Sequence, residues 1–228
     1  MRIAVLTGAG ISRESGLQTF RDGDGLWEGH RVEDVATPEA WERDPEQVLR
    51  FYDQRRADVQ RAQPNPGHRA LAELESRHEV TVITQNIDDL HERAGSTRVI
   101  HLHGEVLKAR SVRDEGLLMD WRGDLKLGDF GPDGAQLRPH VVWFGEGVLG
   151  TNEAWMAAEE ADVFIVCGTS LLVQPAASLI DWTQAPEAYI VDPRPTRTAR
   201  RHGVLHLVEL PASEGLPLVA TQLLNTGN

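Results

Sequence analysis

Cysteine, long apolar runs and positive charge are all scarce in this sequence, and each scarcity excludes a class of protein. The 228 residues include one cysteine, Cys167, so the chain cannot form an internal disulfide. No stretch approaches the roughly 18 consecutive apolar residues that indicate a transmembrane helix. The first strand-like run begins at residue 2 and leaves no room for a signal peptide. We therefore expect a cytoplasmic protein that does not bind a membrane.

Positive charge is outnumbered, because 23 Lys and Arg residues face 35 Asp and Glu residues, for a formal net charge of −12. A nucleic-acid interface needs clustered Lys and Arg, so we expect no nucleic-acid partner. An acidic surface suits a basic peptide, although it is also ordinary for soluble proteins. The composition, 40% hydrophobic and 25% charged, predicts a globular chain of one large or two small domains, which we expect to be a monomer.

A glycine-rich turn follows the first apolar run and organises the N-terminal part of the sequence. Residues 2–7 predict a buried strand, and Gly8, Ala9 and Gly10 follow it directly. Small residues let backbone N–H groups approach a phosphate, and a helix starting at residues 11–15 with Ser12 as its N-cap would face the same anion. This pattern predicts a nucleotide pyrophosphate site. The usual dinucleotide fingerprint has a third glycine at position 13, which is arginine here.

Polar residues also follow three other predicted strands. The strand at 79–84 runs into Gln85 and Asn86, the strand at 163–167 into Gly168, and the strand at 189–191 into Asp192. Ligands bind at the carboxyl ends of the strands in α/β sheets, so we expect these residues to share a site. A further strand is predicted at 204–208, and helices at 45–61, 68–77, 153–161 and 216–224.

Two histidines lie in a short run predicted to be a strand at 99–104. His101 and His103 would point to the same side, because side chains alternate along a strand. A histidine in such a run is often structural, but an imidazole with a pKa near 6.5 can also accept a proton at neutral pH. The residues alone leave both roles open.

Five motifs in register resemble the sirtuins, the NAD-dependent protein deacylases. They are GAGIS-x-ESG-x-x-TFR-x-x-x-GLW from residue 8, TQNID from residue 84, His-Gly at 103, WFGE from residue 143 and GTS from residue 168. The resemblance implies a doubly wound, Rossmann-like α/β sheet with a small inserted, mainly helical domain. It places the NAD-binding domain at residues 1–19, 66–103 and 142–228, and the small domain at 20–65 and 104–141.

The resemblance implies NAD as the cofactor and acylated lysines of peptides or proteins as the substrate, with nicotinamide and O-acyl-ADP-ribose as products. The family places its general base directly before the glycine, which selects His103, and Asn86 is the second catalytic residue. Asn86 and Asp88 are implied to bind the nicotinamide ribose and amide. The residues implied to bind NAD are Gly8, Ala9, Gly10, Ser12, Phe20, Arg21, Trp27, Gln85, Asn86, Ile87, Asp88, Gly168, Thr169, Ser170 and Asp192.

A Tyr-x-x-Arg pair at Tyr52 and Arg55 resembles the pair that binds the acyl carboxylate in sirtuins that remove succinyl and malonyl groups. The two residues share a helix face, although such a pair is usually a packed ring beside a solvated charge. Ala36 resembles the small residue that widens the acyl pocket. The residues implied to bind substrate are Ala36, Tyr52, Arg55, Val142, Phe144, Gly145 and Glu146, and the extended run around Val142 could accept a peptide as an added strand.

The segment 108–138 departs from the family, because most sirtuins hold a structural zinc there with two Cys-x-x-Cys pairs. This segment contains no cysteine. Carboxylates are poor substitutes for thiolates in a tetrahedral zinc site, so we expect no metal site. We expect its acids to form a solvated loop and some of its apolar residues to form a small cluster.

Two other functions remain open from the sequence. An ADP-ribosyltransferase or NAD glycohydrolase would use the same cofactor pocket without an acyl tunnel. A non-catalytic NAD-binding module would follow if the missing cysteines reflected loss of activity, but His103, Asn86 and Asp88 argue against this. Mass spectrometry of acylated peptides incubated with and without NAD separates the three.

Overall fold

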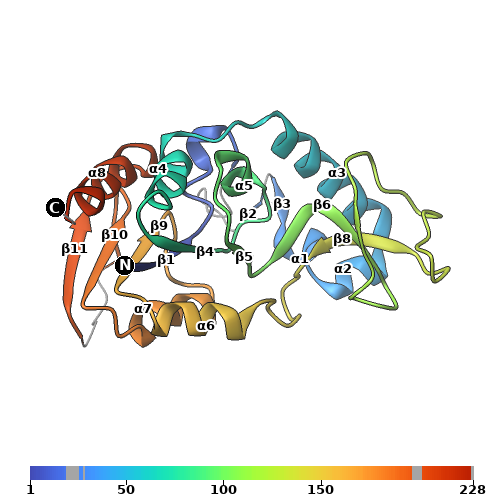
Figure 1. Ribbon diagram of the computed structural model, residues 1–228. Coiled ribbons are helices and arrows are strands. Elements are labelled where there is room, and N and C mark those ends of the chain that lie inside the picture. Colours follow the sequence, from blue (N-terminus) through green and yellow to red (C-terminus); the bar gives the residue numbers. More distant parts are fainter. Residues whose placement is uncertain (19–25, 28, 197–201, 227–228) are drawn as a thin grey trace.

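The computed structural model describes residues 1–18, 26–27, 29–196 and 202–226, and its larger part is built on a six-stranded parallel sheet (Figure 1). The strand order is β11-β10-β9-β1-β4-β5, so the chain fills the sheet in one direction from β1 and then in the other. This is the predicted doubly wound fold. The strands are β1 (Arg2–Thr7), β4 (Glu79–Thr84), β5 (Val99–His101), β9 (Val163–Cys167), β10 (Glu187–Val191) and β11 (Val204–Val208).

Helices cover both faces of this sheet, which explains why its inner strands are apolar throughout. Every residue of β9 is buried. One face packs against α4 (Pro66–Leu74) and α8 (Ala212–Asn225). The other packs against α6 (Thr151–Glu159) and α7 (Leu179–Trp182), which lie below the sheet in Figure 1. Two layers of helix therefore leave the strand ends as the accessible part of the sheet.

The predicted helices are present with shifted boundaries. The helix expected at 68–77 is α4, which starts two residues earlier because the Asn65 side chain accepts a hydrogen bond from Gly67 N at 2.9 Å and caps it. The helix expected at 153–161 is α6, and the last helix, α8, begins four residues before the expected position 216. The strand expected at 189–191 starts at Glu187.

A second group of helices lies beside the sheet, to the right in Figure 1. It contains α1 (Val32–Val35), α2 (Pro38–Arg43) and α3 (Pro45–Arg61), next to the hairpin of β2 (Leu26–Trp27) and β3 (His30–Arg31). Thr37 and Asp44 cap α2 and α3 by accepting hydrogen bonds from Ala40 N and Gln47 N. The bounds of α3 are those predicted.

The cysteine-free segment contains a three-stranded antiparallel sheet, so the prediction of a solvated acidic loop and a mainly helical domain is wrong here. The strands are β6 (Gly104–Ser111), β7 (Leu118–Asp120) and β8 (Leu137–Val141), in the order β7-β6-β8. Several of the acids form tight turns: Asp133 accepts hydrogen bonds from Ser111 Oγ and Ala135 N. We call β6–β8 and their connections the β-module.

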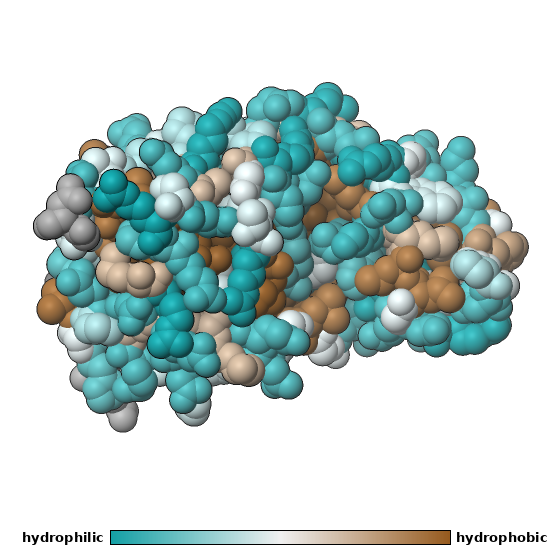
Figure 2. All heavy atoms as spheres, viewed as in Figure 1, coloured by the Kyte–Doolittle hydropathy of each residue, from teal (hydrophilic) through white to brown (hydrophobic). Residues whose placement is uncertain are grey.

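The expected apolar cluster of the β-module is present in part. Leu125 is buried with Ala109 and Leu137 against Leu49 of α3. Leu118 and Phe130, expected in the same cluster, are instead exposed. Figure 2 shows hydrophobic surface at this right-hand end of the molecule, while the rest of the visible face is mostly hydrophilic. Among the described residues, no helix is long and apolar enough to cross a membrane.

All six strands of the parallel sheet come from the segments predicted to form the NAD-binding domain. The helices α1–α3 and the β-module come from the segments predicted to form the small domain. The division into two domains stays a prediction.

Candidate active site

A cleft of about 950 Å³ lies where the carboxyl ends of β1, β4, β9 and β10 face the second group of helices and the β-module. It gathers nearly all of the residues predicted from the sequence. Those lining it are Gly8, Ala9, Gly10, Ser12, Trp27, Ala36, Arg55, Gln85, Asn86, Ile87, Asp88, His103, Val142, Phe144, Gly145, Glu146, Gly168, Thr169, Ser170 and Asp192. The predicted cofactor residues Phe20 and Arg21 lie outside the described residues.

The glycine turn after β1 is locked against the glycine turn after β9. Gly8 N donates to Cys167 O at 3.0 Å, and Gly10 N donates to Gly168 O at 2.8 Å. A Cβ on Gly10 would lie 2.6 Å from the Gly168 Cα, and Gly168 itself has φ +62°. The expectation that these N–H groups face a phosphate is therefore wrong for Gly8 and Gly10. Their lack of side chains instead lets two loops interlock.

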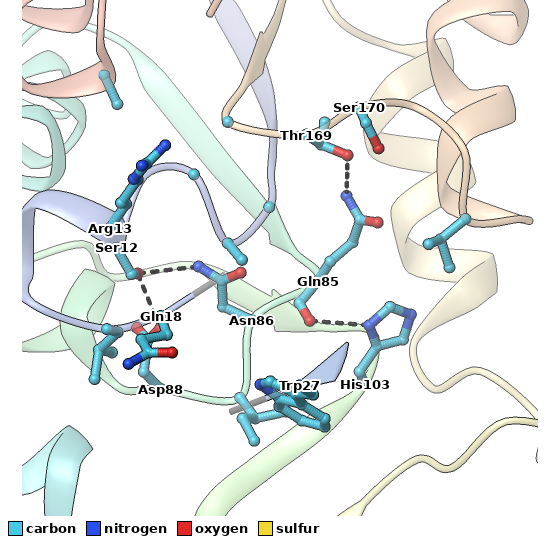
Figure 3. Close-up of a pocket in the computed structure, with 18 of the residues that line it drawn as sticks. Ser12, Arg13, Gln18, Trp27, Gln85, Asn86, Asp88, His103, Thr169 and Ser170 are labelled. Atoms are coloured by element: carbon cyan, nitrogen blue, oxygen red, sulfur yellow. Dashed lines mark hydrogen bonds between the residues drawn. The ribbon is translucent and has the colours of Figure 1, made fainter. Parts of the chain in front are cut away.

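Ser12 does not cap a helix, which corrects a second expectation. The turn that follows it is only a three-residue 3-10 segment, Arg13–Ser15, and the Ser12 side chain makes no cap hydrogen bond. Its hydroxyl donates to Asp88 Oδ2 at 2.9 Å and accepts from Asn86 Nδ2 at 3.1 Å (Figure 3). Ser12 thus fixes the orientation of the Asn86 carboxamide and the Asp88 carboxylate.

His68 lies behind Ser12 and was not singled out from the sequence. Its Nδ1 accepts from Asn65 N, so Nε2 carries the hydrogen and points at Ser12 Oγ, 3.5 Å away. Burial lowers the pKa of His68 to about 4, with a contribution from the charge of Arg69, and the ring is therefore neutral at pH 7. A capped helix N-terminus thus supports the polar cluster of the cleft.

Gln85 connects the ends of two neighbouring strands. Its Nε2 donates to Thr169 Oγ1 at 3.0 Å, which joins the loop after β4 to the loop after β9 (Figure 3). On the far side of β9, Asp192 Oδ1 accepts from Arg194 N at 2.8 Å. Carboxamide, hydroxyl and carboxylate groups therefore line the strand ends, a set that suits ribose hydroxyls.

His103 has the geometry of a base. Its Nδ1 lies 2.9 Å from Gln85 O, and because a carbonyl only accepts, Nδ1 carries the hydrogen and Nε2 has the free lone pair (Figure 3). Burial lowers the pKa of the ring, so it is neutral at pH 7. The predicted strand at 99–104 in fact ends at His101, which does not line the cleft.

Arg55 reaches the cleft from α3, but Tyr52 does not, which corrects the expectation that both face it. The Arg55 side chain is 5% exposed, and its guanidinium lies 5.5 Å from the centroid of the Trp27 ring. Tyr52 is fully buried, and its hydroxyl accepts from Trp143 Nε1 at 3.1 Å. Burial raises the pKa of Tyr52, so the phenol is neutral. Ala36 lies beside Arg55 on the lining.

Residues 142–146 form one wall of the cleft, and their backbone is already hydrogen-bonded. Val142 N donates to His103 O, Trp143 N to Glu146 Oε2 and Phe144 N to Ala36 O, at 2.8–3.0 Å. The expectation of an open backbone edge is therefore wrong for these three N–H groups. A peptide could still pair with carbonyls or with Gly145.

The Glu146 carboxylate anchors this wall. It accepts from both terminal nitrogens of Arg138, at 2.6 and 2.9 Å, and from Arg110 at 3.2 Å. Burial opposes its charge, but Arg138 outweighs this and lowers the pKa of Glu146. Its contact with the wall is thus mainly structural.

Two arginines on the lining were missed from the sequence. Arg13 stands where the dinucleotide fingerprint has its third glycine, and that substitution was the available signal. Arg194 follows the last polar strand end and carried no signal.

A doubly wound sheet with a ribose-like donor set at its strand ends and a neutral histidine beside them defines an enzyme that uses a nucleotide cofactor. The Sir2 family matches residues 8–175, and the chain belongs to that family.

Known proteins agree along most of the chain. An NAD-dependent protein deacylase of Helicobacter pylori (strain ATCC 700392 / 26695) is 52% identical over 195 residues, covering 84% of each protein. A Sir2 homologue solved in complex with NAD has a TM-score of 0.85 at 40% identity, covering 97% of this chain and 88% of that one. A Sir2 structure bound to an acetylated peptide has a TM-score of 0.80 at 32% identity, covering 96% and 92%.

The chain is therefore an NAD-dependent protein-lysine deacylase. The cleft fits this cofactor: the Ser12–Asn86–Asp88 cluster offers an oriented carboxamide and carboxylate, and Gln85 and Thr169 offer amide and hydroxyl groups to a ribose.

Proposed function

We propose that the enzyme removes succinyl and malonyl groups, as well as acetyl groups, from protein lysines. The observation that carries the acyl assignment is Arg55, a nearly buried guanidinium on the lining of the cleft next to Ala36. An arginine is permanently charged and can bind a carboxylate through two parallel hydrogen bonds, which an acetyl group cannot use. Because Tyr52 is withheld under Trp143, Arg55 makes the carboxylate contact in this proposal.

The residues of the cleft divide the work of acyl transfer. Bound NAD supplies the activated ribose carbon that accepts the acyl oxygen. His103 takes a proton from a ribose hydroxyl on Nε2, while its Nδ1–H stays on the Gln85 carbonyl. Asn86 and Asp88, held by Ser12, orient the reacting end of the cofactor. Trp143 and Phe144 form the wall along which the acyl-lysine lies.

Arg55→Met tests the acyl assignment. A charge-assisted contact is worth about 1.5–3 kcal/mol, so the variant should lower the ratio of succinyl to acetyl kcat/KM roughly ten- to a hundredfold. Both rates are measured on one peptide sequence carrying either acyl group, with mass spectrometry of the products. Arg50→Met, which removes an exposed arginine of the same helix, is the matched control and should leave the ratio unchanged. An equal loss on both acyl groups in Arg55→Met would contradict the assignment.

An ADP-ribosyltransferase or NAD glycohydrolase is the second candidate, because it would use the same polar cluster. Its products differ, since the acyl group would stay on lysine. O-acyl-ADP-ribose formed in step with nicotinamide supports deacylation; nicotinamide without loss of the acyl group supports the alternative.

A further inference from the structure

His101 and Glu92 form a pair directly beneath the loop that follows β4. His101 ends β5, and Glu92 lies on α5 (Leu90–Ala94). The ring Nδ1 of His101 lies 3.2 Å from Asn86 O, and Nε2 lies 2.7 Å from Glu92 Oε1. The imidazole is 10% exposed. It therefore bridges a backbone carbonyl of the catalytic loop and a carboxylate.

Both partners of this ring can only accept hydrogen bonds. A neutral imidazole has one N–H, so it would leave a lone pair facing either Asn86 O or the Glu92 carboxylate. Only the doubly protonated ring satisfies both contacts. Burial opposes the charge, but the hydrogen bond and charge of Glu92 outweigh it and raise the pKa of His101.

The neighbouring charges leave Glu92 as the counter-ion of this ring. Glu105 Oε1 on β6 is 4.0 Å from His101 Nε2, but Glu105 already pairs with Lys108 at 2.5 Å. Asp88 in the loop receives the Ser12 hydroxyl. His91, on the same helix as Glu92, is buried with a pKa well below its ordinary value and is neutral.

His101 and His103 therefore hold two consecutive carbonyls of one loop. His103 Nδ1–H donates to Gln85 O, and His101 Nδ1–H donates to Asn86 O. Their outer nitrogens differ: that of His103 carries a free lone pair at the cleft, whereas that of His101 is on Glu92. The same local geometry thus yields one neutral base and one cation.

We propose that His101 is a positioning residue, an imidazolium held by Glu92 that fixes the Asn86 carbonyl and with it the side chains that orient NAD. The loss of its proton at alkaline pH breaks one of the two contacts. The loop after β4 then loosens, and the affinity for NAD falls while the chemistry of His103 is unaffected.

The test measures KM for NAD with an acetyl-lysine peptide, so that the outcome is independent of acyl preference, and the Kd for NAD by quenching of tryptophan fluorescence. His101→Leu removes both contacts and should raise KM and Kd for NAD roughly tenfold or more, with a smaller change in kcat. His101→Asn keeps one N–H for the Asn86 carbonyl and should restore part of the affinity. Melting temperatures check the fold of each variant.

The pH profile separates a positioning ion pair from a merely structural contact. In the wild type, KM for NAD should rise at alkaline pH, above the raised pKa of His101. Glu92→Gln should move this rise to lower pH, and His101→Asn should abolish it. Glu79→Gln, which removes an exposed carboxylate at the far end of β4, is the matched control. A Glu92→Gln profile that superposes on the wild type, or wild-type KM in His101→Leu, would overturn the proposal.

Discussion

The Nδ1–H of His103 is committed to the Gln85 carbonyl, so only Nε2 is left to accept a proton. Burial adds to this arrangement by lowering the pKa of the ring, which keeps the base neutral below the ordinary value of about 6.5. Both effects depend on a residue 18 positions earlier in the chain. The strength of the base is therefore set by the loop after β4 as much as by His103.

Replacing the base is the direct test of this assignment. His103→Tyr should lower acyl transfer by roughly 10²–10⁴, because that is the usual contribution of a positioned general base. Turnover is measured as deacylated peptide, and the melting temperature reports on the fold. Near-wild-type turnover would rule His103 out.

Residue by residue, the sequence predicts best where a polar group follows a strand. Asn86, Asp88 and Thr169 reach the cleft because parallel strands end at one edge. The direction of individual groups could not be predicted in this way. The shared face of Tyr52 and Arg55 was predicted, but the longer side chain reaches the cleft while the ring is held under Trp143. Likewise, the motif gives Gly8 and Gly10 but not the partners of their N–H groups.

Among the elements, the interlocked turns after β1 and β9 allow the least change. Gly168→Ala should lower the free energy of unfolding by about 2–4 kcal/mol, because it combines a left-handed φ with a clash against the Gly10 backbone. Denaturant titration measures this loss, and NAD affinity should fall with it.

Gly134→Ala is the control for this change. Gly134 has a similar φ of +73°, but a Cβ there meets no atom within 4 Å. It should cost only the backbone term, about 1–2 kcal/mol. Equal losses in the two variants would show that packing between the turns adds nothing.

At this scale the parallel sheet was predictable and the β-module was not. The runs that form β1, β4, β9 and β11 are apolar and end in polar turns, so their bounds follow from the sequence. The strands of the β-module are interrupted by acids and glycines, and β7 is only three residues long. The acids mark its turns, which the charge pattern alone does not distinguish from a loop.

For the whole molecule, buried neutral histidines predict loss of stability in acid. Burial lowers the pKa of His68 and of His140 to about 4, with arginine charges adding to the effect. The unfolded chain, with histidine pKa near 6.5, then binds more protons, so the free energy of unfolding falls as pH drops from about 6.5 to 4. His68 alone should account for about 3 kcal/mol at pH 4.

Urea titrations at several pH values between 7 and 4 measure this loss. His68→Gln should flatten the dependence relative to the wild type while lowering stability at pH 7, because the contact with Asn65 is weakened. An unchanged slope in this variant would mean that other groups cause the acid sensitivity.

The locking of the two glycine turns has a consequence for how the chain acquires its fold. Ile3 pairs with Val163, so the turn after β1 gains its partner only after a very long loop has closed. A fragment that ends before β9 carries the GAGIS motif but cannot form the cofactor site. NAD therefore recognises only chains whose central strands have met, and by mass action it favours the completed sheet over partly folded forms. The cofactor thus also acts as a reporter of complete folding.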